Sequence, residues 1–300
     1  MPKARKSNKP FILVSPAKLN LALQITGRRP DGFHTLNTVF ERIDLEDTLA
    51  FSVSGDDGIH ISCSHPGVPV DGRNLVYKAA LVLREATKTC KGVRVHIEKN
   101  IPVAAGLAGG SSNAATALLG LNRLWKLKLS RAALIRLAKK IGSDVAFFLY
   151  DVPFAQGTLR GDRIRKLPVR HRFWHVLITA EQPLLTKDVY GVYAQRFLAG
   201  DVAGLTKKSA DVTMLIRSLG SNDAAGAQRL VFNDLQGPIG ALRPGLLKLK
   251  ARVQQLAGAG VCFSGSGPSI FALTRTRAEA ENIAEVFRRK YRQVFVVRTA

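Results

Sequence analysis

Apolar and polar residues alternate with a period of two in several short segments of the first third of the chain. Such alternation, bounded by Gly and Asp, indicates strands that are buried on one face. The expected strands are the short apolar run 11–14 and the alternating segments 19–25, 48–53, 59–63 and 93–97. Between the last two, residues 74–87 place Leu75, Ala79 and Leu83 on one face at helical spacing, which predicts an amphipathic helix.

A loop and two helices are expected next. Residues 101–110 are rich in Gly and Ala, which favours a loop. The three residues that follow, 111–113, are Ser-Ser-Asn, and these types often cap helix N-termini. A long helix is therefore expected over residues 114–125. Ser130 predicts the cap of a further helix over residues 131–141.

Beyond residue 157 the pattern changes to strands separated by long helical segments. The expected strands are residues 171–179, 261–264, 269–273 and 294–297, and the expected helices are residues 188–198, 211–219, 224–242, 245–256 and 277–291. This order suits a ferredoxin-like α+β domain. Since domains hold roughly 100–200 residues, we expect an N-terminal domain at 1–157 and a C-terminal domain at 158–300.

The net charge bears on what the chain binds. Lys and Arg number 45 against 22 Asp and Glu, which gives +23. The excess is spread evenly, at +11 in residues 1–150 and +12 in residues 151–300. It favours anionic partners: nucleic acid, an acidic membrane surface or phosphorylated small molecules. The one dense basic run is Lys3, Arg5, Lys6 and Lys9. It is expected to be a solvated tail, with a targeting peptide as the alternative.

Composition excludes several classes of protein. With 46% hydrophobic and 22% charged residues, the chain is neither disordered nor fibrous. No apolar run approaches the ~18 residues of a transmembrane helix. The three cysteines, Cys63, Cys90 and Cys262, are far apart and form no CxxC pair. A disulfide framework or zinc site is therefore not expected, and the cytoplasm is the expected compartment.

The strongest candidate site is the small-residue segment 101–115, which contains Gly-Gly-Ser-Ser at 109–112. Small side chains let a backbone approach an anion closely, and the N-terminus of the following helix supplies unpaired N–H groups. The segment lacks the Gly-Lys-Ser/Thr ending of a Walker A loop. We interpret it as a phosphate cradle, with an ordinary tight turn as the alternative.

Three further positions carry candidate chemistry. Lys18 is either a surface lysine or places its ammonium in a partly buried anionic pocket. Asp144 follows Gly-Ser, and it either caps a helix or accepts a hydroxyl proton during phosphoryl transfer. Residues 263–269 read Phe-Ser-Gly-Ser-Gly-Pro-Ser. They are either a hairpin turn or a second set of N–H groups for phosphate.

Taken in this order, the four features resemble the GHMP kinase superfamily, which joins galactokinase with the homoserine, mevalonate and phosphomevalonate kinases. Three segments narrow the resemblance to the members that phosphorylate a diphosphocytidyl sugar alcohol. They are Ser-Pro-Ala-Lys-Leu-Asn-Leu at 15–21, Gly-Arg-Arg-Pro-Asp-Gly-Phe-His-Thr-Leu at 27–36 and Gly-Ser-Asp-Val at 142–145. The matching motifs run from about residue 12 to residue 273, which is nearly the whole chain.

The resemblance implies a fold and an activity. The fold is the α+β, two-domain GHMP kinase fold, with a ribosomal protein S5 domain 2-like N-terminal domain and a ferredoxin-like C-terminal domain. The activity is ATP-dependent phosphorylation of the substrate's 2-hydroxyl, in isoprenoid precursor biosynthesis. The implied cofactors are ATP and Mg²⁺.

The same resemblance implies roles for individual residues. Asp144 is the implied catalytic carboxylate, with Lys18 beside it to hold it ionised. The implied nucleotide-binding residues are Asn74, Lys99, Pro102, Ala105, Gly106, Leu107, Ala108, Gly109, Gly110, Ser111 and Ser112, with Ser112 also a candidate Mg²⁺ ligand. The implied substrate-binding residues are Asn20, Phe33, His34, Tyr190, Gly265 and Ser266.

Within these sets, Asn74 and Lys99 match positions that line the adenine pocket. His34 matches the residue that reads the cytosine edge, and Phe33 and Tyr190 match the aromatic residues that stack on the cytosine ring. The family often has Tyr at the position of Phe33, so a hydroxyl hydrogen bond is lost here while stacking is kept.

The expected partners are small molecules, namely ATP and a diphosphocytidyl sugar alcohol, bound by a monomer or a homodimer. No membrane and no specific nucleic acid is expected. Two other functions stay open. One is a kinase of the same superfamily for a different small alcohol. The other, motivated by the +23 charge, is a nucleic-acid-binding protein, although aromatic residues make up only 7% of the chain and no known binding motif is present.

Overall fold

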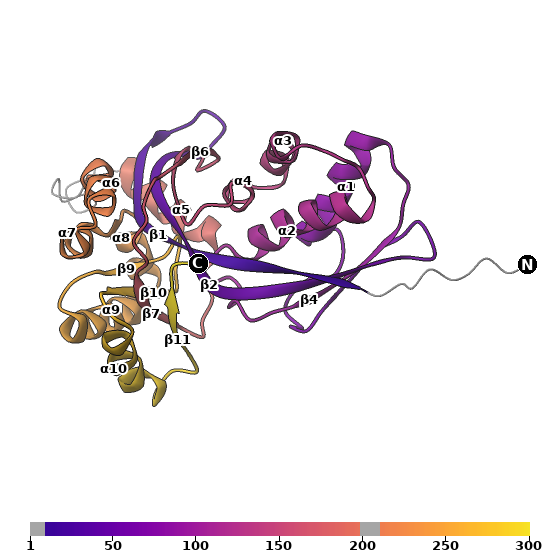
Figure 1. Cartoon of the computed structure of the whole chain (residues 1–300). Coiled ribbons are helices and arrows are strands. Elements are labelled where there is room, and N and C mark those ends of the chain that lie inside the picture. The colour runs from indigo at the N-terminus through magenta and orange to yellow at the C-terminus, as the bar shows by residue number, and fades with distance from the viewer. Residues whose placement is uncertain (1–9, 199–210) are drawn as a thin grey trace, which may run out of the picture. The chain divides into compact units, whose positions relative to one another are not determined.

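The computed structural model describes residues 10–198 and 211–300, and Figure 1 shows its elements. The basic run from Lys3 to Lys9 lies outside the described residues. The chain forms two compact units whose segments interleave. Unit 1 consists of Met1–Ala17, Leu45–Val103 and Gly109–Asp151, and unit 2 of Lys18–Asp44, Ala104–Ala108 and Val152–Ala300. No helix in the described residues is long and apolar enough to span a membrane.

Unit 1 is a small sheet with a group of helices. Strand β3 (Ile59–Cys63) pairs in parallel with β4 (Val93–Glu98), and β4 pairs antiparallel with the second half of β2 (His34–Val53). The helices are α1 (Leu75–Thr87), α2 (Gly109–Leu124), α3 (Arg131–Ile141) and α4 (Val145–Leu149). They pack on one another (Figure 1).

Unit 2 is built around a four-stranded antiparallel sheet. Its strands are β7 (Trp174–Thr179), β9 (Val261–Phe263), β10 (Ile270–Thr274) and β11 (Gln293–Arg298), in the order β11-β7-β10-β9. Helices α9 (Pro244–Ala257) and α10 (Arg277–Arg288) pack against these strands. The strand connections and the sheet order are those of a ferredoxin-like fold, so this expectation is confirmed.

The other elements of unit 2 lie before and between these strands. The first strands are β1 (Phe11–Arg28), which begins in unit 1, and the first half of β2. The hairpin strands β5 (Phe154–Leu159) and β6 (Arg163–Lys166) follow, and β5 pairs with β2. The remaining elements are α5 (Thr186–Leu198), α6 (Val212–Gly220), α7 (Ala224–Leu230), β8 (Phe232–Asn233) and α8 (Gln236–Leu242).

Local cap chemistry explains why several helices begin where the sequence predicts. The Ser130 hydroxyl accepts from the N–H of Ala133, and Asn74 caps α1 by accepting from the N–H of Val76. Thr276 and Glu279 form a reciprocal capping box at the start of α10. These contacts lie within a few residues of sequence, so they form wherever the local pattern occurs.

The prediction of two separate strands over residues 11–25 is wrong. The chain forms one strand, β1, that continues through Pro16 to Arg28. Proline fixes φ near −65°, a value that extended backbone tolerates, although it cannot donate to a ladder. The strand expected at 48–53 is the end of a much longer strand, β2, and the strands β5 and β6 were not predicted.

The predicted start of the helix after residue 113 is also wrong. Helix α2 begins at Gly109, so Ser111, Ser112 and Asn113 lie inside it rather than before it. Ser112 and Asn113 do not act as caps, because their side chains make long-range hydrogen bonds instead, to Ser15 and Asp47. Tertiary contacts therefore override the cap preference of these residue types.

The single helix predicted over residues 224–242 is broken in the structure. Between α7 and α8, the short strand β8 pairs in parallel with Ala22 and Leu23 of β1. The Asn233 amide donates to the carbonyls of Phe263 (2.9 Å) and Gly265 (2.8 Å). These contacts supply hydrogen-bond partners for residues that are not helical. Their partners lie elsewhere in the chain, so the pattern of the segment does not predict them.

A buried pair in unit 2 carries a stability prediction. His175 Nε2 lies 3.0 Å from Glu41 Oε1, both side chains are fully buried, and Thr299 donates to the same oxygen. We expect Glu41→Ala to lower the free energy of unfolding by about 3–5 kcal/mol, because it leaves His175 and Thr299 buried without their hydrogen-bond partner. Urea unfolding followed by circular dichroism measures this loss.

The exposed pair of His96 and Glu98 (3.6 Å) is the matched control for this prediction. Removal of Glu98 is expected to cost less than about 1 kcal/mol, because water already screens that pair. Equal losses in Glu41→Ala and Glu98→Ala would contradict the interpretation that burial sets the cost.

Candidate active site

The N-terminus of α2 forms the part of the candidate phosphate cradle that lies in unit 1. Gly109, Gly110 and Ser111 occupy the first turn of α2, where backbone N–H groups have no helical partner. A Cβ on Gly109 would lie 3.1 Å from Lys99 Nζ and 3.0 Å from Ile101 Cγ2. Only a residue without a side chain therefore fits without displacement. The turn offers N–H groups and a positive dipole end to an anion.

A buried polar network holds this turn in place. Asp47 is fully buried, and its Oδ1 accepts from the N–H groups of Asn100 (2.8 Å) and Ile101 (2.9 Å). Its Oδ2 accepts from the Lys99 ammonium and from Asn113 Nδ2 (2.8 Å). Asp47 thus joins the segment before the loop to the first turns of α2, and it satisfies the charge of Lys99.

The network continues to Ser112, the candidate Mg²⁺ ligand. Asn113 Nδ2 donates to Ser15 Oγ (2.9 Å), and Ser15 Oγ donates to Ser112 Oγ (2.8 Å). The Ser112 hydroxyl therefore keeps its own proton and one lone pair for another partner. Sequence reasoning had identified Lys99 and Ser112 but had missed Asp47, Ser15 and Asn113.

Asn74 and Pro102, also predicted to bind the nucleotide, are buried in unit 1. The side chain of Asn74 caps α1 and donates to the carbonyl of Pro69 (2.6 Å). Within the unit, Asn74 therefore has a defined structural role whatever its contribution to binding.

Asp144 occupies the N-cap position of α4, but its side chain makes no capping hydrogen bond. The prediction that the Asp144 side chain caps a helix is therefore wrong, although the residue stands at the N-cap position. All five residues of α4 are buried, so packing rather than capping holds the helix, while Asp144 itself is half-buried. The position of Asp144 is thus set by a short, buried apolar helix.

In unit 2, Lys18 is buried with only 3% of its surface exposed. Its ammonium donates to the Asn20 side-chain oxygen and to the carbonyl of Gly106 (3.2 Å). The surface-lysine alternative is therefore excluded. The Asn20 amide is oriented in turn by Thr38, which accepts from Asn20 Nδ2 (2.8 Å) and donates to the carbonyl of Ala22 (2.6 Å).

The loop of residues 104–108 lies against the Gly-Ser-Gly turn of the β9–β10 hairpin. Ser264 Oγ donates to the carbonyl of Gly106 (2.9 Å) and accepts from the N–H of Asn20 (3.3 Å). Gly106 has a φ of +76°, and a Cβ there would lie 2.2 Å from the carbonyl oxygen of Ser264. Only glycine fits this position. Residues 263–269 therefore form a hairpin turn, which was one of the two alternatives. Through Ser264, the turn also contacts the candidate site residues Asn20 and Gly106.

The two sequence-distant residues predicted to bind a base lie together. The ring centroid of His34 is 5.3 Å from that of Tyr190 and 5.4 Å from that of Tyr193. Burial, with a smaller contribution from the positive charge of Arg28, lowers the pKa of His34 below its usual 6.5. The imidazole is therefore neutral at pH 7, with one ring nitrogen to donate and one to accept.

Helix α5, which carries both tyrosines, is joined to the glycine-rich hairpin. Thr186 Oγ1 and Ser266 Oγ share a hydrogen bond of 2.9 Å. Sequence reasoning had missed Tyr193 and Thr186, although the three-residue spacing of Tyr190 and Tyr193 places them on one helix face.

Phe33 differs from the other predicted aromatic residues in being 55% exposed. The guanidinium of Arg160 lies 5.2 Å from its ring centroid, a cation–π distance. The turn that carries Phe33 is fixed by Asp31, which accepts from Arg29 Nε (3.0 Å) and from the N–H of Phe33 (3.2 Å). The Arg29 hydrogen bond is the main cause of the lowered pKa of Asp31.

Comparison with known proteins agrees with the fold. Residues 74–151 match the GHMP kinases N terminal domain, and residues 215–293 match the GHMP kinases C terminal domain. A homoserine kinase from Cytophaga hutchinsonii superposes with a TM-score of 0.72 at 20% identity, covering 100% of this chain and 97% of that one. At that identity the likeness concerns the fold.

Two kinases whose names specify a cytidine-diphosphate methylerythritol substrate are more similar to this chain. The 4-diphosphocytidyl-2-C-methyl-D-erythritol kinase of Exiguobacterium sibiricum is 38% identical over 288 residues, which are 96% of this chain and 97% of that protein. A crystal structure of 4-(cytidine 5'-diphospho)-2C-methyl-D-erythritol kinase superposes with a TM-score of 0.78 at 31% identity, covering 97% of this chain and all of that one. The chain therefore belongs to the GHMP kinases and, within them, to the family of the 4-diphosphocytidyl-2-C-methyl-D-erythritol kinases.

Proposed function

We propose that the chain transfers the γ-phosphoryl group of ATP to the 2-hydroxyl of 4-diphosphocytidyl-2-C-methyl-D-erythritol, a step in non-mevalonate isoprenoid precursor biosynthesis. The observation that supports this substrate is the packing of the neutral His34 ring against Tyr190. His34 is the last residue of the Arg-x-Asp-Gly-Phe-His turn. Stacking on a ring and bonding to its edge is how a protein selects one base.

The proposed catalytic residues are Asp144 and Lys18. Asp144 accepts the proton of the attacking hydroxyl, and the Lys18 ammonium supplies positive charge for the reaction. Phosphoryl transfer otherwise depends on positioning and on neutralising the charge of the phosphates. The burial of Lys18 among fixed oxygens supports this role, because a held ammonium needs no rearrangement during the reaction.

The proposed ATP site uses Ala105–Ser112 together with Pro102, Asn74 and Lys99. The first turn of α2 offers N–H groups to the phosphates, and the loop glycines allow close approach. Asp47 already balances the charge of Lys99, so we propose that Lys99 lines the site without pairing with a phosphate.

The division of the chain into domains at residue 157 stays a prediction.

We propose that Mg²⁺ enters with the nucleotide. The described residues contain no group of three or more His, Cys, Asp or Glu side chains placed to hold a metal ion. The Ser112 hydroxyl, which accepts from Ser15 and keeps a further lone pair, fits a cation held mainly by phosphate oxygens with one or two protein oxygens. Ser112 is the proposed protein ligand. Bound there, Mg²⁺ would offset negative charge on the phosphates.

The proposed substrate residues divide by what they recognise. His34 bonds the cytosine edge, while Tyr190 and Phe33 stack on its faces. Asn20 accepts from Lys18, and Gly265 lies beside both residues. Asn20 and the N–H groups of Gly265 and Ser266 would contact the phosphorylated part of the substrate.

A coupled assay of ADP release tests the activity. Turnover is expected with the cytidyl substrate and not with galactose, homoserine or mevalonate. Turnover of one of those three, with no turnover of the cytidyl compound, would instead establish a kinase for another small alcohol.

The base-binding site carries a separate prediction. We expect His34→Ala and Tyr190→Ala each to raise KM for the cytidyl substrate by about 10–100-fold, since a base-edge hydrogen bond or a stacked ring contributes roughly 1–3 kcal/mol. KM for ATP should stay within about twofold in the same steady-state assay. His60→Ala, which removes an exposed histidine of unit 1, is the control and should change neither constant.

The lowered pKa of His34 adds a pH dependence to this prediction. The wild-type KM for the cytidyl substrate should rise only as the pH falls through a value below 6.5, where the ring gains its second proton. His34→Ala should lack that rise. A variant KM close to wild type at pH 7.5 would contradict the proposed reading of the base by His34.

A further inference from the structure

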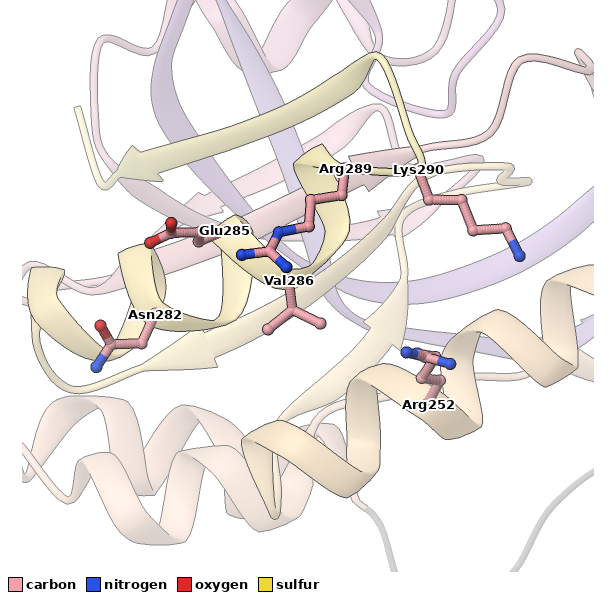
Figure 2. A pocket seen from close by; sticks show the side chains of 6 residues that line it. All are labelled: Arg252, Asn282, Glu285, Val286, Arg289 and Lys290. Carbon is pink, nitrogen blue, oxygen red and sulfur yellow. The ribbon is translucent and has the colours of Figure 1, made fainter.

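The surface of unit 2 has a hollow of about 530 Å³ between α9 and α10, which is shown in Figure 2. Its lining residues are Arg252, Asn282, Glu285, Val286, Arg289 and Lys290. None of these residues belongs to the proposed active site. The volume lies in the range of pockets that hold small molecules, roughly 300–1,000 Å³.

Three cationic side chains line this hollow against one carboxylate. Arg252 comes from α9, while Arg289 and Lys290 follow the last residue of α10. In Figure 2, Val286 lies between Arg289 and Arg252, and Lys290 extends from the end of α10. Cations at a helix C-terminus complement its carbonyls, but that effect does not account for Arg252 in the middle of α9.

The cations of the hollow differ from their neighbours on the same face. Arg288 pairs with Glu281 (2.9 Å), and Arg292 pairs with Glu181 (3.9 Å). Among the described residues, by contrast, no carboxylate lies within 4.0 Å of the charged groups of Arg252, Arg289 or Lys290. The hollow therefore has an excess of cations over carboxylates, and none of its three cations is held in an ion pair with another described residue.

The sequence explains why Arg252 is not balanced by a carboxylate of its own helix. Residues 235–278 contain six basic residues and no Asp or Glu, and α9 lies within this stretch. The proposed kinase reaction uses few of the basic side chains behind the net charge of +23. The α9–α10 face is one place where the unused excess gathers in a concave site.

We propose that the hollow binds a cluster of phosphate groups on a small molecule, as an inorganic or organic oligophosphate presents them. Guanidinium groups bind phosphate oxygens through paired, charge-assisted hydrogen bonds, and a lysine adds a point charge. The 41% exposed Val286 gives the site an apolar centre, which suits an organic group attached to the phosphates.

Isothermal titration of the full chain with inorganic tripolyphosphate tests the proposal. The titration is made at physiological salt, with Mg²⁺ and excess non-hydrolysable ATP analogue to occupy the kinase site. The test variant carries Arg252→Gln, Arg289→Gln and Lys290→Gln. The control carries Arg277→Gln, Arg288→Gln and Arg292→Gln, which removes the same charge from residues outside the hollow.

We expect the wild type to bind tripolyphosphate, the test variant to bind it at least ~10-fold more weakly, and the control to stay within ~2-fold. Charge-assisted hydrogen bonds support a loss of this size. The kinase activity of all three proteins should be unchanged, so this result is independent of the proposed function.

Three outcomes would overturn the proposal. In the first, the wild type does not bind tripolyphosphate at millimolar concentration. In the second, the two variants weaken binding equally, as diffuse charge attraction requires. In the third, a short single-stranded RNA binds through the three residues while tripolyphosphate does not, which would make the face a nucleic-acid surface.

Discussion

Asp144→Asn is expected to lower kcat by roughly 10²–10⁴-fold, the usual cost of removing a general base. The amide keeps the size of the carboxylate and loses only its basicity. Because the Asp144 side chain does not cap α4, the substitution removes no helix cap. Single-turnover measurement with both substrates saturating gives the chemical step directly.

Asp151→Asn is the matched control for this change. Asp151 lies just after α4, is exposed, and faces Arg131 at 3.8 Å. Its replacement should leave kcat within about twofold. If Asp144→Asn also retained turnover within about tenfold of wild type, Asp144 would not be the base, and Lys18 would become the candidate for proton transfer.

Gly106→Ala is expected to have the second large effect, on both stability and activity. A Cβ at this position meets the Ser264 carbonyl oxygen at 2.2 Å, and the φ of +76° disfavours any side chain. Strain of about 1–3 kcal/mol and overpacking of about 1–3 kcal/mol predict a loss of about 2–6 kcal/mol. Since the loop must shift, kcat/KM should fall by about 10²-fold.

Gly258→Ala separates the two causes. Gly258 has a similar φ of +72°, but no atom lies within 4 Å of a Cβ built there. It therefore reports the backbone strain alone, and we expect a loss of about 1–3 kcal/mol with unchanged kcat/KM. Thermal unfolding and steady-state kinetics on both variants give the comparison, and equal effects on both proteins would show that the contact with Ser264 is unimportant.

Much of the architecture was predictable because its causes are local. The caps of Ser130 and Thr276 mark the starts of α3 and α10, and period-two alternation marks β3 and β4. The failures share one physical cause. Residues 231–235 are not helical, because they form hydrogen bonds with β1 and with the β9–β10 turn instead. These partners lie far away in the sequence, so no local window contains them.

The candidate site divides in the same way. Lys18, Asp144, His34 and the glycine-rich segment belong to motifs whose spacing is visible in the chain. Asp47 was missed because an aspartate among alternating strand residues looks like a solvent-facing position. Only its burial and its four hydrogen-bonding partners reveal it as the centre of a network.

By itself, the sequence determined the family, the α+β class, the ferredoxin-like unit and most of the residues proposed to act. These follow from motif order, hydrophobic periodicity and cap chemistry, which are properties of short segments. The tertiary structure alone decided that Asp144 does not cap its helix, that Lys18 is buried, and that His34 packs against Tyr190. The reason is that burial, side-chain pairing and pKa shifts depend on residues far apart in the chain, which only folding brings into contact.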